Sequence, residues 1–218
     1  MYLIFAKIIP KMLHQKWDQD EYEGYWMEGD SLAPPCQSED EVIASILDLI
    51  AGHYEAVMDA SSNVEVPVNP LMYDLGCGDG RICVEGCKRF PALRAIGCEI
   101  EESLIPRMKK NISDFGLEDR MEPLNEDLRN ISLDGAHIIV VYLLAESIAE
   151  IKPKLIHALL SNHGGEGCVV VCNSWGIKDK DVTPNKKVSC GYGNNTTLFL
   201  YDRSSVGAGY VDTYVDAR

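Results

Sequence analysis

Apolar residues are spaced along most of the chain in two alternating patterns. Short runs rich in valine, isoleucine and leucine are typical of buried strands, and longer stretches with apolar residues three or four positions apart are typical of helices. The predicted strands cover residues 71–75, 94–99, 120–124, 136–142 and 167–172. The predicted helices cover residues 81–90, 102–115 and 148–161, and Pro153 is expected to interrupt the last of them. This alternation predicts a parallel sheet with helices on both faces.

Two further β-rich segments, residues 187–190 and 197–201, predict a hairpin near the C-terminal side. Gly191 and Gly193 lie in the residues that join them and suit a turn. The segment 202–218 has no assignable pattern beyond a loop, which its two glycines suggest.

The N-terminal part of the chain divides into an arm and a helix. Ser38 and Glu41 have the spacing of a capping box, and the apolar face that follows predicts a helix over residues 42–50, with an end between residues 52 and 58. Residues 59–70 are polar, contain two prolines and predict a linker. The expected organisation is an arm and capping helix over residues 1–60, one α/β domain over 61–203 and a tail over 204–218.

The first 16 residues carry three lysines and no acidic residue among large apolar groups. Their apolar stretch is too short to span a bilayer. We expect an amphipathic helix packed on the domain. The alternative is a segment that targets the chain or docks it on a membrane, and the absence of arginine argues against a transit peptide.

Composition indicates that the chain can bury a full core, since 46% of its 218 residues are hydrophobic. The 34 acidic residues outnumber the 20 basic ones, which gives a formal net charge of −14. Such a surface repels phosphate backbones, so a nucleic-acid partner is not expected. A basic protein or a small-molecule amine fits the charge better.

The eight cysteines form no C-x-x-C pair, and most of them lie inside apolar strand or helix patterns. Free cysteine behaves there as a small hydrophobic residue. We therefore expect reduced thiols, no metal site and an intracellular, cytoplasmic protein, with mitochondria as the alternative location. The sequence leaves the oligomeric state open.

One stretch stands between the first strand and the first helix of the predicted domain. Asp74 is followed there by three glycines at alternate positions, Gly76, Gly78 and Gly80. Glycines let the backbone turn sharply and approach a ligand without a Cβ atom in the way. The helix beyond them offers N–H groups suited to a carboxylate or a phosphate. The dinucleotide fingerprint G-x-G-x-x-G has a different spacing, so a nicotinamide or flavin dinucleotide is not expected.

Acidic residues follow three successive predicted strands. Asp74 ends the first strand, Glu99 ends the second about twenty residues past the glycine loop, and Asp127 follows the third. In an open parallel sheet, ligands bind beyond the carboxyl ends of the strands. There Glu99 can accept hydrogen bonds from both hydroxyls of a ribose, and Asp127 can accept one from an adenine amino group. Their order and spacing predict one shared site.

The run D-L-G-C-G-D-G from Asp74 to Gly80 resembles the first motif of class I S-adenosylmethionine (SAM) methyltransferases. The resemblance covers residues 71–201. It implies a Rossmann-like three-layer αβα sandwich whose mostly parallel, seven-stranded sheet has an antiparallel last strand, with the N-terminal helical arm added. It also implies SAM as cofactor, with the glycines under its methionine part, Glu99 on ribose and Asp127 on adenine. We group three neighbouring residues with this cofactor site, namely Cys77, Ile100 and Leu128.

A longer run, residues 73–82, and two later segments, residues 141–144 and 153–155, look closer to one branch of that family. The branch contains the mitochondrial protein-lysine methyltransferases that act on ATP-synthase subunit c and on the adenine nucleotide translocase, with their prokaryotic relatives. In that branch a proline-containing segment and a helix precede the core, as residues 34–35 and 38–50 do here. The arm and the first helices match only loosely, so the substrate does not carry over.

The segment that follows the fourth predicted strand reads Y-L-L-A-E-S from Tyr142 to Ser147. It differs from the Asn-Pro-Pro-Tyr or Asp-Pro-Pro-Tyr clamp of nucleic-acid and glutamine N-methyltransferases, and the Pro-Cys of C5 enzymes is also missing. That leaves direct attack of a neutral amine on the methyl carbon. A lysine must first lose its proton, and burial beside aromatic faces lowers its pKa.

Two residues are candidates for catalysis. Tyr142 ends the fourth strand. Glu146 could hold the ammonium or accept its proton. An equal alternative is that its negative charge only stabilises the N-terminus of a helix. The candidates for the substrate pocket are Tyr25, Trp26 and Trp175, although core packing explains the two tryptophans equally well.

The sequence thus predicts a SAM-dependent N-methyltransferase, with a protein lysine as the expected acceptor. A small-molecule methyltransferase and an inactive SAM-binding regulatory or scaffold protein are the alternatives.

The arm over residues 17–35 carries four aromatic residues among six acids. We expect it to fold over the SAM pocket, where the acids would attract a basic substrate and the aromatic rings would dehydrate its amine. The alternative is a disordered acidic extension.

Overall fold

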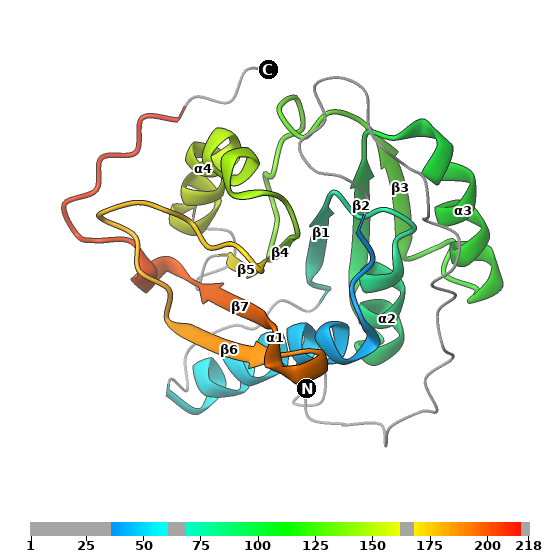
Figure 1. Ribbon diagram of the computed structural model, residues 1–218, viewed down its shortest axis with the longest axis horizontal. Helices are drawn as coiled ribbons and strands as arrows, with labels where there is room; N and C mark the ends of the chain where they lie inside the picture. Colours follow the sequence, from blue (N-terminus) through cyan, green and yellow to red (C-terminus); the bar gives the residue numbers. More distant parts are fainter. Residues whose placement is uncertain (1–35, 61–68, 162–167, 215–218) are drawn as a thin grey trace.

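A seven-stranded sheet forms the centre of the molecule (Figure 1). The computed structural model describes residues 36–60, 69–161 and 168–214. The strands are β1 Leu71–Leu75, β2 Arg94–Glu99, β3 Met121–Asn125, β4 Ile138–Val141, β5 Val169–Asn173, β6 Lys186–Cys190 and β7 Thr196–Tyr201. The α-helices are α1 Asp40–Ala60, α2 Arg81–Arg89, α3 Ile105–Asp114 and α4 Ala145–Leu160. Short 3-10 turns occur at η2 Glu102–Leu104, η3 Tyr192–Asn194 and η4 Arg203–Ser205.

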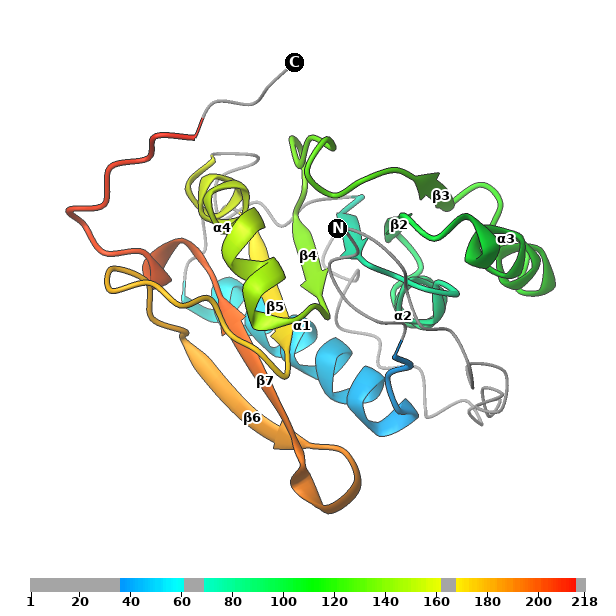
Figure 2. The same cartoon turned by 45° about the horizontal axis from the view of Figure 1, so that its top comes forward.

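The strands lie in the order β3-β2-β1-β4-β5-β7-β6. Strands β1 to β5 pair in parallel, whereas β7 is antiparallel to both of its neighbours, β5 and β6. Strand β6 therefore runs in the same direction as β5. The carboxyl ends of β4, β5 and β6 consequently lie at one edge of the sheet, where their arrowheads are seen in Figure 2. The predicted mostly parallel sheet with a reversed last strand is confirmed.

Alternate residues of the central strands belong to two separate cores, as the two-residue period of a strand requires. Met72 and Val140 pack in the core that α1, α2 and α3 cover. Their neighbours Tyr73 and Val141 pack in the core that α4 covers. The sheet is thus buried on both faces, and the molecule has the predicted three layers (Figure 1).

Helix α1 covers one face of the sheet together with α2. Its buried residues Val42, Ile46 and Ile50 share a core with Leu198 of β7. The helix begins at Asp40, two residues after the predicted cap, and continues past the predicted end to Ala60. The hydroxyl of Ser38 instead accepts a hydrogen bond from Asn173 Nδ2 at 3.4 Å, at the end of β5.

Helix α4 begins at Ala145, three residues before its predicted start, and it continues through Pro153. The prediction that this proline would interrupt the helix was wrong. Pro153 is exposed, whereas Ile148, Ile151 and Leu155 are buried against the sheet. Packing of this apolar face outweighs the one backbone hydrogen bond that a proline removes.

Residues 1–35 lie outside the described residues, so the predictions made for the arm remain predictions. Within the described ranges, no helix has both the length and the apolar character needed to cross a bilayer.

Candidate functional site

The loop between β1 and α2 has a left-handed backbone at each of its three glycines. The angle φ is +77° at Gly76, +58° at Gly78 and +77° at Gly80. Residues with a side chain rarely adopt such angles. A Cβ atom on Gly76 would also lie 3.0 Å from Leu143 Cδ2, in the segment after β4. Glycine therefore allows the loop to lie directly against that segment.

Two residues of the loop face the core. A Cβ atom on Gly80 would lie 2.6 Å from Met121 Cε and 2.9 Å from Met108 Cγ, so the glycine permits close packing of the loop against α3 and β3. The Sγ atom of Cys77 lies 3.6 Å from Met108 Sδ, and burial raises the pKa of this thiol well above its ordinary value. The Cys77 side chain is thus a packing group.

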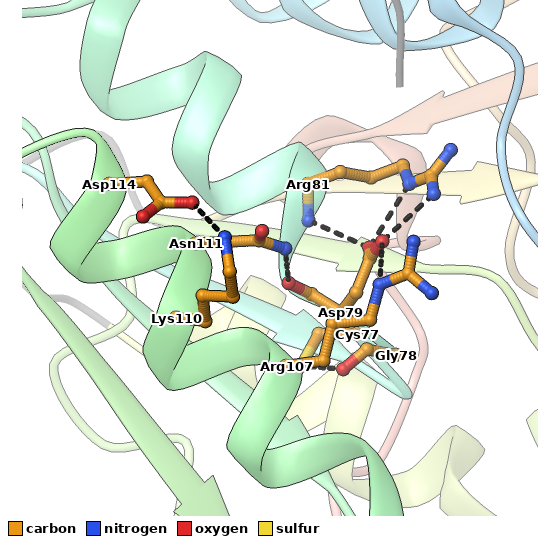
Figure 3. Close-up of polar contacts among 8 residues, drawn as sticks. All are labelled: Cys77, Gly78, Asp79, Arg81, Arg107, Lys110, Asn111 and Asp114. Atoms are coloured by element: carbon orange, nitrogen blue, oxygen red, sulfur yellow. Dashed lines mark hydrogen bonds and ion pairs between the residues drawn. The ribbon is translucent and has the colours of Figure 1, made fainter. Parts of the chain in front are cut away.

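A polar network holds the loop from the side of α3 (Figure 3). The Asp79 carboxylate accepts hydrogen bonds from Arg81 Nε at 3.0 Å and from another guanidinium nitrogen of Arg81 at 2.8 Å, and both side chains are almost fully buried. Arg107 Nε lies 3.6 Å from the same carboxylate, and Asn111 Nδ2 donates to the Asp79 carbonyl at 2.9 Å. Asp79 also accepts from the Arg81 backbone N–H at 3.3 Å. One of the helix N-terminal donors expected to face a ligand is therefore already engaged.

The Glu99 carboxylate lies at the end of β2, beside the glycine loop. Its Oε2 accepts a hydrogen bond from the Gly78 backbone N–H at 2.8 Å, and its Oε1 accepts one from the Glu101 N–H at 2.9 Å. Burial raises the pKa of Glu99, and these hydrogen bonds act in the opposite direction. Each oxygen keeps a lone pair for a further donor, such as a hydroxyl group.

Asp74 is buried beneath the loop. Burial, together with the negative charges of Glu99 and Asp79, raises the pKa of its carboxyl group to about 8, and a contact with Cys83 acts in the opposite direction. Asp74 is consequently a largely neutral acid at pH 7. It supports the loop from below, at the position that the sequence predicts.

The remaining predicted cofactor residues lie after β2 and β3. Ile100 is 43% exposed, an unusual state for isoleucine, and it offers an apolar face next to Glu99. The Asp127 carboxylate is paired with Arg129, whose backbone N–H donates at 2.8 Å and whose guanidinium donates at 2.6 Å. The side-chain bond lowers the pKa of Asp127. Leu128 is buried, and its carbonyl accepts from Lys154 Nζ at 2.7 Å.

A second group of residues surrounds Tyr142, which directly follows β4. Burial, together with a hydrogen bond to Cys36, raises the pKa of Tyr142 to about 12. Its hydroxyl donates to Cys36 Sγ at 3.3 Å. Ser174, at the end of β5, has φ of +67°, which is rare for a residue with a side chain. The next residue, Trp175, is 46% exposed, so it is no core tryptophan.

Other residues of this edge come from α1, α4 and the β6–β7 hairpin. The Glu39 carboxylate accepts from the Tyr192 backbone N–H at 2.9 Å, and its charge contributes to the raised pKa of Tyr142. Glu146 is exposed in the first turn of α4. The structure thus brings Tyr142, Trp175 and Glu146 to one edge of the sheet, while Tyr25 and Trp26 lie outside the described residues.

The glycine loop and its neighbours fit SAM. Gly76 and Gly78 leave backbone surface open for close approach, Glu99 has acceptor capacity for hydroxyl groups, and Ile100 offers an apolar face for an aromatic ring. The fold and this site define a SAM-dependent methyltransferase.

Comparisons with known proteins agree. The family model of the ANTKMT methyltransferase domain matches residues 74–185, and the chain belongs to this family. A protein-lysine N-methyltransferase of Saccharolobus islandicus is 30% identical over 138 residues, which are 63% of this chain and 81% of that protein. A carboxy-S-adenosyl-L-methionine synthase of Nautilia profundicola is 25% identical over 158 residues, 69% of this chain and 64% of that protein.

Among solved structures, the chain is similar to an RNA methyltransferase from Salinibacter ruber in complex with S-adenosyl-L-homocysteine. The TM-score is 0.61, the sequence identity is 21%, and the match covers 81% of this chain and 97% of that chain. At this identity the likeness concerns the fold alone.

Several residues of the site are missing from the sequence prediction. Arg107, Asn111, Glu39 and Lys154 are polar residues on helices or at a helix start, where a solvated surface position is the ordinary expectation. Only the pairing of Asp79 with Arg81 two residues later could have pointed to a network at the loop. The contacts of the other residues depend on helices that are distant in sequence.

Proposed function

We propose that this methyltransferase transfers the methyl group of SAM to a lysine amine of a protein. The carrying observation is that Gly76 of the cofactor loop lies against Leu143, the residue next to Tyr142. In this proposal Tyr142 borders the loop on the side from which a substrate approaches. The protein-lysine N-methyltransferase of Saccharolobus islandicus supports the same acceptor by similarity.

In this proposal the cofactor is held by residues at the ends of β1, β2 and β3. The backbone of Gly76 and Gly78 would lie under its methionine part, Glu99 would accept from the ribose hydroxyls, and Ile100 would pack on the adenine ring. Asp127 accepts from the adenine amino group. Bound SAM supplies a methyl carbon to which the amine nitrogen bonds as the carbon–sulfur bond breaks.

The residues after β4 and β5 prepare the amine. Tyr142 stays protonated at neutral pH because burial raises its pKa to about 12, so its oxygen accepts a hydrogen bond as a neutral phenol. The exposed ring of Trp175 covers the methylene groups of a lysine side chain, and desolvation there lowers the pKa of the amine. Glu146, open to solvent, receives the proton that the ammonium must lose before it reacts.

The charge of this edge favours a cationic substrate. Glu39 and Glu146 are both exposed near Tyr142, and the whole chain carries a formal net charge of −14. A protein segment with lysine or arginine near the target would be attracted to such a surface.

The test is methyl transfer from isotope-labelled SAM into a cell extract that is then separated into protein, nucleic acid and small molecules. We expect label in protein, recovered as methyllysine after acid hydrolysis. The control is Gly78→Val, which is expected to remove cofactor binding. Label that appears only in small molecules, or in protein residues other than lysine, would overturn the proposal.

A further inference from the structure

The side chain of Lys154 is buried although it carries an ammonium group. Lys154 lies on α4 and is 5% exposed. Its Nζ donates to three backbone carbonyls, those of Leu128 at 2.7 Å, Arg129 at 3.1 Å and Ile131 at 2.6 Å. An ammonium has three N–H donors, so this set of acceptors matches its full capacity.

The three carbonyls belong to one loop, which leads from β3 toward β4 and contains Asp127 near its start. The loop is anchored on its apolar side by Leu128 and Ile131, which pack in the core covered by α4. A turn in which the Asn130 N–H donates to the Asp127 carbonyl at 2.9 Å orients the carbonyls that follow. Lys154 therefore joins helix α4 to the loop that carries Asp127.

We propose that Lys154 is a positioning residue for the SAM site, acting through Asp127. Burial of an ammonium is unfavourable unless hydrogen bonds replace its water, and here one short loop supplies three acceptors. Without the ammonium, three converging carbonyls would repel one another and remain unsatisfied. The loop would then turn away, and the Asp127 carboxylate would leave the position at which it faces the adenine ring.

This inference rests on the proposed placement of Asp127 in the SAM site, and it is independent of which molecule accepts the methyl group. It also explains why the helix that begins beside Tyr142 carries a lysine on its buried face. Helix α4 lies on the substrate side at its first turn, and about two turns later Lys154 contacts the loop that carries Asp127.

The experiment measures SAM affinity by calorimetry for Lys154→Met, Asp127→Asn and the double variant. Methionine has nearly the same length as lysine and no donors. We expect Lys154→Met to weaken SAM by about tenfold, the effect of leaving buried acceptors unpaired. We expect Asp127→Asn alone to weaken it by about fivefold, and to add less than about twofold in the Lys154→Met background, because the two residues act as one unit.

The matched control is Lys152→Met, on the same helix two residues away. Lys152 Nζ pairs with Asp179 at 2.8 Å and is not directed at the loop, so its variant should bind SAM within about twofold of the original chain. If Lys154→Met does not fold, Lys154→Gln serves instead; its amide offers two donors for three carbonyls, so we expect a smaller loss of SAM affinity, of about threefold.

Three results would overturn the inference. SAM affinity could be unchanged in the Lys154 variant, the two single effects could multiply in the double variant, or Asp127→Asn alone could have no effect. The last result would remove Asp127 from the cofactor site. None of the three would bear on methyl transfer to lysine, which the labelling experiment tests separately.

Discussion

The Glu99 carboxylate and the Gly78 backbone N–H form a 2.8 Å hydrogen bond across the carboxyl ends of β2 and β1. This bond connects the acidic residue of one strand to the glycine loop of its neighbour. Because Glu99 also accepts from the Glu101 N–H, its carboxylate is held from both sides before any ligand is bound. Such an arrangement favours tight and oriented binding, since little ordering remains to be done.

Replacement of Gly78 by valine should remove SAM binding. The native φ of +58° is unfavourable for a β-branched residue by about 1–3 kcal/mol, and the side chain would occupy the surface that the cofactor approaches. Calorimetry on the folded variant is the measurement. Gly209→Val, at an exposed position with open space where a Cβ atom would lie, is the control. Unchanged affinity in Gly78→Val would show that the loop is not the cofactor site.

Replacement of Glu99 by alanine should weaken SAM binding by about 1–3 kcal/mol, the range for loss of a charge-assisted hydrogen-bond partner. The same variant frees the Gly78 N–H, so part of the loss would come from the loop itself. Glu55→Ala, at an exposed position of α1, is the comparison. If the two variants bind SAM equally well, Glu99 does not hold the ribose.

Replacement of Tyr142 by phenylalanine should lower turnover by about tenfold or more while leaving SAM affinity within about twofold, because we propose that the hydroxyl acts on the amine and not on the cofactor. Single-turnover methylation and calorimetry together separate the two effects. Tyr192→Phe is a matched control, since Tyr192 is 84% exposed and only its backbone N–H contacts Glu39. A parallel loss of SAM affinity would place Tyr142 in the cofactor site instead.

The buried Asp74 should make stability depend on pH. Its pKa is about 8 in the folded chain against an ordinary 3.8, so between these values the folded state holds a proton that the unfolded chain has lost. The contribution of Asp74 to the free energy of unfolding is therefore complete below about pH 4 and declines as pH rises through about 8.

The Asp74→Asn variant lacks this titration and should lose less stability between about pH 5 and pH 8 than the original chain. Urea unfolding at fixed pH values measures the difference. Asp119→Asn, at an exposed position, should follow the original chain. Parallel pH curves for the original chain and Asp74→Asn would show that Asp74 ionises normally.

Deletion of residues 1–35 should leave SAM affinity within severalfold of that of the full chain. It should strongly reduce methyl transfer, because we propose that the arm forms one wall of the substrate site. The measurements are calorimetry and turnover on the same methyl acceptor. Double replacement of Tyr25 and Trp26 by alanine tests the aromatic part of the arm in the intact chain. A truncated protein with full turnover would show that the arm has no role in catalysis.

The sequence by itself determined the order of the elements and the cofactor loop. Strands β1 and β2 have the predicted bounds because both are short apolar runs, and Pro70 and Gly76 border the first of them. The positive φ angles at Gly76, Gly78 and Gly80 agree with the freedom that three alternating glycines offer. Local chemistry was sufficient at these positions.

Only the tertiary structure decided which distant residues complete the site. Asn111 contacts Asp79, which is 32 positions earlier in the chain. Lys154 contacts the loop after β3, which is at least 23 positions earlier. Glu39 contacts Tyr192, which is 153 positions later. The exposure of Trp175 and the passage of α4 through Pro153 depend in the same way on packing against the sheet. A sequence pattern reports which face of an element is apolar, whereas the partner of each polar side chain is set by how those faces pack together.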